Sequence, residues 1–197
     1  MAKNKKALVK KPKTVRKKAV NKAAKKPTTK SVRPKSSRTK GKVSSPKLGV
    51  GQRIPDFSLP GTQGQFNLRA VGKKVVLFFY PKDNTPGCTL EGQEFNRLLA
   101  DFTAAGVVVV GVSRDSLKSH EGFCVKQGFQ FALLSDEDGR ICEMFDVIKP
   151  KNMYGKTVMG IERSTFVISP DGVLLAEWRK VKPEGHAAEV LEKIKSL

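Results

Sequence analysis

The chain has 197 residues, of which 38 are Lys or Arg and 18 are Asp or Glu, so its formal charge at neutral pH is +20. The charge is uneven, because residues 1–47 contain 19 basic residues and no acidic one, which leaves 19 basic and 18 acidic residues in 48–197. No apolar run is long enough to cross a bilayer, and the first residues lack the apolar core of a secretory signal, so we expect neither a membrane protein nor an exported one.

Residues 1–47 also lack aromatic side chains, and prolines interrupt them at four positions. Such a segment cannot bury enough apolar surface to offset the entropy of ordering it. We therefore predict a disordered tail over 1–47 and one domain over 48–197, long enough to bury roughly 70% of its unfolded surface. The tail's cations attract phosphates, and it has no element that reads bases, so we expect non-specific DNA or RNA binding. An anionic membrane surface and a merely solubilising extension are the alternatives.

The first half of the domain predicts two short strands, a buried strand and a helix. Phe57–Leu59 and Gln65–Leu68 flank a Gly-containing turn and form a hairpin signal. The apolar run Val75–Tyr80 predicts a buried strand, and Thr89–Ala104 predicts a helix that Gly106 stops.

The second half continues the alternation of strands and helices. Strands are predicted at Val107–Val112 and Phe131–Leu134, and a hairpin is predicted from Thr165–Ser169 and Val173–Trp178. Helices are predicted at about 117–127, with Ser116 as cap and Gly128 as stop, at Gly139–Phe145 and at Glu184–Lys195. Apolar strands that alternate with helices imply an α/β fold whose central sheet is covered on both faces, and the terminal hairpins imply that this sheet is mixed.

Cys88 stands where the first buried strand gives way to the first helix. In the first turn of a helix, free backbone N–H groups and the helix dipole favour a thiolate over a thiol. The chain has three cysteines, Cys88, Cys124 and Cys142, an odd number without C-x-x-C or metal-type spacing. This pattern favours thiol chemistry in a reducing compartment, and we expect no cofactor and no metal.

The pattern Pro-x-x-x-Thr-x-x-Cys at Pro81, Thr85 and Cys88 resembles the active-site motif of the peroxiredoxins. The surrounding Phe-Tyr-Pro-Lys-Asp-x-Thr-Pro-Gly-Cys-Thr, together with Gly-Val-Ser-Arg-Asp-Ser at 111–116 and Glu-Arg-Ser-Thr-Phe at 162–166, is similar to the bacterioferritin comigratory protein (PrxQ) subfamily. The resemblance covers 48–197. It implies a thioredoxin-like fold, reduction of hydrogen peroxide and alkyl hydroperoxides by a thiol, a monomer, and thioredoxin as the reductant. The tail resembles a histone H1-type tail in composition alone.

The resemblance also implies roles for four residues. Cys88 is the peroxidatic cysteine, Thr85 bonds the peroxide and the sulfur through its hydroxyl, Pro81 shields the site from water, and Arg163 stabilises the thiolate and positions the peroxide. A fixed guanidinium suits this chemistry, because attack on one peroxide oxygen pushes negative charge onto the other. The product on the cysteine is a sulfenic acid.

One position departs from the pattern of many members, which carry a resolving cysteine five residues after the first. Here that residue is Gln93, and Cys124, 36 residues after Cys88 in the next predicted helix, resembles the other arrangement of the subfamily. A disulfide needs a Cα separation of roughly 4.4–6.8 Å, so we expect a helix turn to unwind in each cycle. The alternative for Cys124 is a buried apolar residue, and Cys142 is predicted to lie in the core.

The remaining candidates have ordinary roles: His120 and His186 are expected at the surface or as caps, and Glu91 either orders the active-site helix or is solvated. Two other functions stay open, namely a DNA-coating protein with an idle thioredoxin-like domain and a one-cysteine peroxidase reduced by glutathione or another thiol. The expected location is cytoplasmic, at the nucleoid of a bacterium or in the nucleus of a eukaryote if the tail binds DNA.

Overall fold

A computed structural model describes residues 48–153 and 156–197, so the prediction for 1–47 lies outside the described residues. Its elements, in chain order, are β1 (Ser58–Gly61), β2 (Gly64–Asn67), the 3-10 turn η1 (Arg69–Val71), β3 (Lys74–Phe79), α1 (Pro86–Arg97), α2 (Leu99–Ala104), β4 (Val107–Ser113), α3 (Leu117–Gln127), β5 (Ala132–Ser135), α4 (Arg140–Met144), β6 (Ile148–Met153), β7 (Lys156–Ile161), β8 (Ser164–Ile168), β9 (Leu174–Trp178) and α5 (His186–Lys195).

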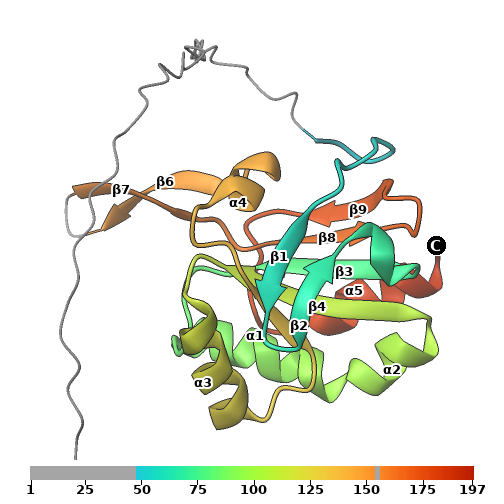
Figure 1. The fold of residues 1–197 in the computed structure, drawn as a ribbon, viewed down its shortest axis with the longest axis horizontal. Helices are drawn as coiled ribbons and strands as arrows, with labels where there is room; N and C mark the ends of the chain where they lie inside the picture. Colours follow the sequence, from blue (N-terminus) through green and yellow to red (C-terminus); the bar gives the residue numbers. More distant parts are fainter. Residues whose placement is uncertain (1–47, 154–155) are drawn as a thin grey trace, which may run out of the picture. The chain divides into compact units, whose positions relative to one another are not determined.

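Seven of the strands form one sheet in the order β2-β1-β5-β4-β3-β8-β9 (Figure 1). β5, β4 and β3 are parallel, whereas β8 and β9 on one side and β1 and β2 on the other are antiparallel to their neighbours. The two central strands read as continuous apolar runs because both of their faces are covered. The predicted mixed sheet is thus confirmed.

Helices cover both faces of this sheet. One buried cluster joins Phe95 of α1, Phe102 of α2, Phe123 of α3 and Val190 of α5, while a second joins the opposite face to Ile141 of α4. In Figure 1, α1, α2 and α3 lie on one side of the sheet, and α4 lies on the other with the β6–β7 ribbon. The predicted α/β architecture with helices on both faces is confirmed.

The helix predicted over 89–104 is in fact two helices. The backbone of Leu98 leaves the helical region at φ −96° and ψ 7°, and it separates α1 from α2. The aromatic rings of Phe95 and Phe102 are both buried and lie 5.7 Å apart across this break. Because the apolar spacing continues through the bend, the sequence period alone does not reveal it.

The two-stranded ribbon of β6 and β7 was absent from the sequence prediction. Its strands pair from Ile148↔Ile161 to Met153↔Lys156, outside the main sheet. Their sequences contain Lys at three positions and a proline, Pro150, so they lack the apolar alternation that announces a strand. A separate ribbon tolerates such residues because both of its edges are free of the sheet.

Local signals placed α3 correctly. The hydroxyl of Ser116 accepts a hydrogen bond from the backbone N–H of Ser119, and Gly128 ends the helix with φ 69°. Within the described ranges, no helix is long and apolar enough to cross a membrane.

Candidate active site

Cys88 is the third residue of α1, in its first turn. Strand β3 delivers the chain to a short loop in which Asn84 adopts φ 57°, a conformation that asparagine tolerates better than most residues. Thr85 is the extended N-cap, Pro86 occupies the first helical position, and Thr89 donates its backbone N–H to the carbonyl of Thr85 at 2.9 Å. The thiol is therefore buried at the positive end of a helix, as the sequence predicted.

Arg163 reaches Cys88 from the segment between β7 and β8. Its Nη2 donates a hydrogen bond to Cys88 Sγ at 3.3 Å, and its Nη1 pairs with Oε2 of Glu91, which lies one helical turn beyond the cysteine. Burial would lower the pKa of Arg163, but the charges of Glu91 and Cys88 raise it above its ordinary value. One guanidinium thus holds a carboxyl group and the sulfur at once.

Glu91 is a buried acid, so the solvated alternative for this residue was wrong. Only 1% of it is exposed, and its Oε1 has no hydrogen-bond partner among the described residues. Burial raises the pKa of Glu91 to about 7, although the charge of Arg163 opposes this rise. Glu91 therefore orders the site by fixing Arg163, and its own charge is sensitive to pH near neutrality.

The two other motif residues lie in the loop before α1. The hydroxyl of Thr85 donates to the carbonyl of Lys82 at 3.0 Å, which orients the side chain at the helix start. Pro81 is exposed at the beginning of the loop. The shielding of the site by Pro81 and the contact of Thr85 with peroxide stay predictions.

Lys151 of β6 contacts the segment that leads to Arg163, and no motif in the sequence predicts this contact. Its Nζ donates to the carbonyl of Ile161, two residues before Arg163, and its side chain lies over Gly160. Burial and the charge of Arg163 lower the pKa of Lys151, whereas the charge of Cys88 opposes this. The β6–β7 ribbon thus places one basic side chain against the segment that leads to Arg163.

Cys124 lies in the middle of α3 and is half-buried. Its Sγ donates to Oγ1 of Thr62 at 3.8 Å, in the turn between β1 and β2, and burial raises the pKa of this thiol. Cys88 has Arg163 as its partner instead, so the two sulfurs face different surroundings, and both are free. Gln93, at the alternative resolving position, donates to Oε1 of Gln127 at the end of α3.

Cys142 is a core residue, as predicted. It is fully buried in α4, and its backbone N–H donates to Oδ2 of Asp136 at 2.7 Å. Burial, followed by the carboxylate of Asp136, raises the pKa of the thiol far above its ordinary value. This cysteine is therefore chemically quiet.

The predicted surface or capping roles of the two histidines were wrong. His120 is fully buried in α3, where its Nδ1 lies 2.9 Å from Oδ2 of Asp83. His186, at the start of α5, is also buried, and its Nε2 lies 2.8 Å from Oγ1 of Thr165. The sequence could not indicate either contact, because both partners come from other elements.

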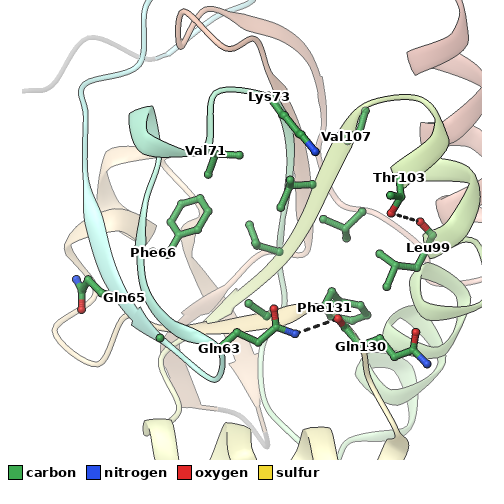
Figure 2. Close-up of a pocket in the computed structure, with 15 residues that line it drawn as sticks. Gln63, Gln65, Phe66, Val71, Lys73, Leu99, Thr103, Val107, Gln130 and Phe131 are labelled. Atoms are coloured by element: carbon green, nitrogen blue, oxygen red, sulfur yellow. Dashed lines mark hydrogen bonds between the residues drawn. The ribbon is translucent and has the colours of Figure 1, made fainter.

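A pocket of the domain lies away from Cys88 (Figure 2). It has a volume of about 370 Å³ between the β1–β2 hairpin, α2 and the start of β4, with Phe66, Leu99 and Phe131 among its lining residues and a hydrogen bond from Gln63 to the carbonyl of Gln130 at its border. None of the predicted site residues lines it.

Comparisons with known proteins agree with this arrangement. The AhpC/TSA family model matches residues 50–176. Peroxiredoxin Bcp of Xanthomonas campestris pv. campestris is 57% identical over 145 residues, which are 71% of this chain and 90% of that protein. Peroxiredoxin Bcp of Bacillus subtilis is 45% identical over 150 residues, 75% of this chain and 96% of that protein.

Solved structures give the same answer. A structure described as giving insights into the alkyl peroxide reduction activity of the Xanthomonas campestris bacterioferritin comigratory protein matches with a TM-score of 0.70 and 54% identity, over 76% of this chain and 96% of that one. A cysteine-to-serine mutant of Xylella fastidiosa PrxQ matches with a TM-score of 0.73 and 47% identity, over 77% and 98%. This chain therefore belongs to the AhpC/TSA family, among its peroxiredoxins of the Bcp (PrxQ) type, and it is a thiol-dependent peroxidase with a thioredoxin-like fold.

Proposed function

We propose that Cys88 is the peroxidatic cysteine and that Arg163 stabilises both its thiolate and the transition state. The observation that carries this proposal is the contact of Arg163 Nη2 with Cys88 Sγ at 3.3 Å, in the first turn of a helix. An Arg side chain stays protonated at every physiological pH, so this contact favours the deprotonated sulfur.

The first step is a nucleophilic substitution at oxygen. The Cys88 thiolate attacks one oxygen of the hydroperoxide, an S–O bond forms, and the O–O bond breaks. The other oxygen leaves with the electron pair and takes up a proton to become water or an alcohol, while the sulfur is oxidised to a sulfenic acid. Arg163 and the N–H groups at the start of α1 face the negative charge that develops on the leaving oxygen.

Cys124 then resolves the sulfenic acid as an intramolecular disulfide. Its thiolate attacks the Cys88 sulfur, an S–S bond forms, and the hydroxyl leaves as water after protonation. Two cysteine-to-serine mutants of the Xanthomonas campestris protein substitute cysteines 36 positions apart, the spacing of Cys88 and Cys124 here. We assign thioredoxin, acting on the monomer, as the dithiol that reduces this disulfide.

The test compares two serine variants. Cys88→Ser abolishes peroxide reduction and keeps the fold, because serine fits the first turn but its hydroxyl is not ionised at neutral pH. Cys142→Ser is the control, since its hydroxyl can donate to Asp136 and it takes no part in the chemistry. Appreciable turnover by Cys88→Ser would refute the assignment.

A second function concerns residues 1–47. Their 19 cations without a single acid motivate the proposal that they bind DNA or RNA through phosphates, independently of the chemistry of the domain. This binding would place a cytoplasmic peroxidase beside nucleic acid, where it removes peroxide locally.

A further inference from the structure

The loop that leads to Cys88 contains a buried carboxylate, that of Asp83. Asp83 accepts hydrogen bonds from the hydroxyls of Tyr80 at 2.8 Å and Ser119 at 2.7 Å, and from Nδ1 of His120 at 2.9 Å. Burial alone would raise the pKa of Asp83, but the hydrogen bonds from His120 and Ser119 outweigh it, and the pKa lies below its ordinary value. Asp83 is therefore a charged acceptor held by three donors.

The hydrogen bonds around Asp83 connect the loop before Cys88 with the helix that contains Cys124. Asp83 belongs to the loop and stands five residues before Cys88. His120 belongs to α3, four residues before Cys124, so these two side chains lie on the same face of the helix. The carboxylate of Asp83 consequently connects the backbone that opens α1 with the helix that holds the second cysteine.

Helix α3 has few buried side chains that hold it to the domain. Only His120 and Phe123 are buried among its residues, and Val125, next to Cys124, is 85% exposed. The end of the helix is held separately, because the side chain of Asn96 in α1 donates to the carbonyl of Gly128 at 3.3 Å. Segments with few buried apolar contacts open at low free-energy cost, so the hydrogen bonds of His120 and Ser119 to Asp83 contribute to the local stability of α3 together with the packing of Phe123.

The geometry of His120 makes this contact specific. The carboxylate of Asp83 can only accept, so Nδ1 of His120 is the donor, and Nε2 is buried without a hydrogen-bond partner among the described residues. If the loop moves, the Nδ1–H group loses its acceptor while still buried. A buried N–H group without an acceptor raises the free energy of the folded state, so the state in which α3 unwinds and exposes His120 to water becomes more favourable.

We propose that His120 is a positioning residue that couples the loop carrying Cys88 to α3 and delays the release of Cys124. While Asp83 is in place, α3 stays folded and Cys124 stays bonded to Thr62. When oxidation of Cys88 displaces the loop, His120 loses its acceptor, α3 unwinds, and Cys124 reaches the sulfenic acid. This coupling rests on the proposed disulfide between Cys88 and Cys124.

The test compares two variants of the full chain, each with a single substitution in α3. His120→Phe keeps a ring of similar size and removes the donor, and Ser119→Ala removes a second hydrogen bond to Asp83 with little change in packing. Lys118→Ala, exposed on the same helix, is the matched control. Hydrogen exchange over 117–127 of the reduced protein is measured, and rapid quenching followed by mass spectrometry separates sulfenic acid formation from disulfide formation.

We expect exchange in α3 to accelerate roughly tenfold in His120→Phe and less in Ser119→Ala, because a hydrogen bond to a charged group is lost. The rate of disulfide formation relative to sulfenic acid formation rises in the same order, and over-oxidation needs more peroxide. Unchanged exchange in both variants, or faster exchange without faster disulfide formation, overturns the coupling. A wild-type protein that forms no disulfide at all instead refutes the proposed resolving role of Cys124 and leaves the peroxidatic role of Cys88 standing.

Discussion

Arg163 donates a hydrogen bond to the sulfur of Cys88 at 3.3 Å although 75 positions separate the two residues in the sequence. The same guanidinium pairs with Glu91, three residues after Cys88. The contact therefore depends on two elements that only the fold brings together, and the carboxyl group determines where the guanidinium stands.

Substitution of Arg163 should slow the formation of sulfenic acid on Cys88, and more so by alanine than by lysine. Arg163→Ala removes the donor that faces the developing negative charge, so sulfenic acid formation slows by about 10²-fold. Arg163→Lys keeps a point charge but cannot hold Cys88 and Glu91 with two separate nitrogens, so its loss is smaller, about tenfold. Stopped-flow kinetics of the reduced protein with hydrogen peroxide measures both. Arg97→Ala, exposed on α1, serves as the control, and an unchanged rate in Arg163→Ala would deny Arg163 a catalytic role.

Glu91 makes the stability of the reduced protein depend on pH. Its pKa of about 7 lies above the value near ~4.3 of a free glutamate, so between these values the folded protein holds a proton that the unfolded chain has released. The contribution of Glu91 to the free energy of unfolding is therefore largest below the unfolded pKa and is lost as pH rises through 7.

Glu91→Gln removes this dependence. Urea unfolding from about pH 5 to pH 8 should show a smaller loss of stability for the variant than for the wild type. Glu121→Gln, at an exposed position of α3, keeps the wild-type profile. Identical profiles for wild type and Glu91→Gln would mean that Glu91 is ionised throughout.

Cys124→Ser separates oxidation from turnover. The serine hydroxyl can replace the thiol as the donor to Thr62, so α3 keeps its contact with the β1–β2 turn. The variant should reduce one equivalent of peroxide, fail to turn over with thioredoxin, and pass to sulfinic acid more readily. Steady-state turnover equal to that of the wild type would favour a one-cysteine peroxidase.

Deletion of residues 1–47 tests the role of the tail. If about ten of its cations meet phosphates, log K falls against log salt with a slope near −9, without preference for base sequence. The 48–197 form should lose DNA binding in mobility-shift assays and keep peroxide turnover. Binding retained by 48–197 would locate the interaction in the domain, and no binding by the full chain at ~50 mM salt would end the proposal.

Local signals explain which parts of the fold the sequence could predict. Ser116 and Gly128 bound α3 because caps act within a few residues, and the short segment between β3 and α1 placed Cys88 in the first helical turn. The bend at Leu98 was not predicted because the helical spacing of apolar residues continues through it. The β6–β7 ribbon was not predicted because its sequence has no regular alternation of apolar and polar residues. The partners of Glu91 and His120 lie 72 and 37 positions away, and no local pattern encodes such contacts.

The most direct test of the account is the mass of the full-length protein under non-reducing conditions after one equivalent of hydrogen peroxide, followed by peptide mapping. The account predicts a mass lower by two hydrogen atoms and a peptide in which Cys88 is linked to Cys124, with Cys142 still a free thiol. A persistent sulfenic acid on Cys88, or a disulfide that includes Cys142, would contradict it.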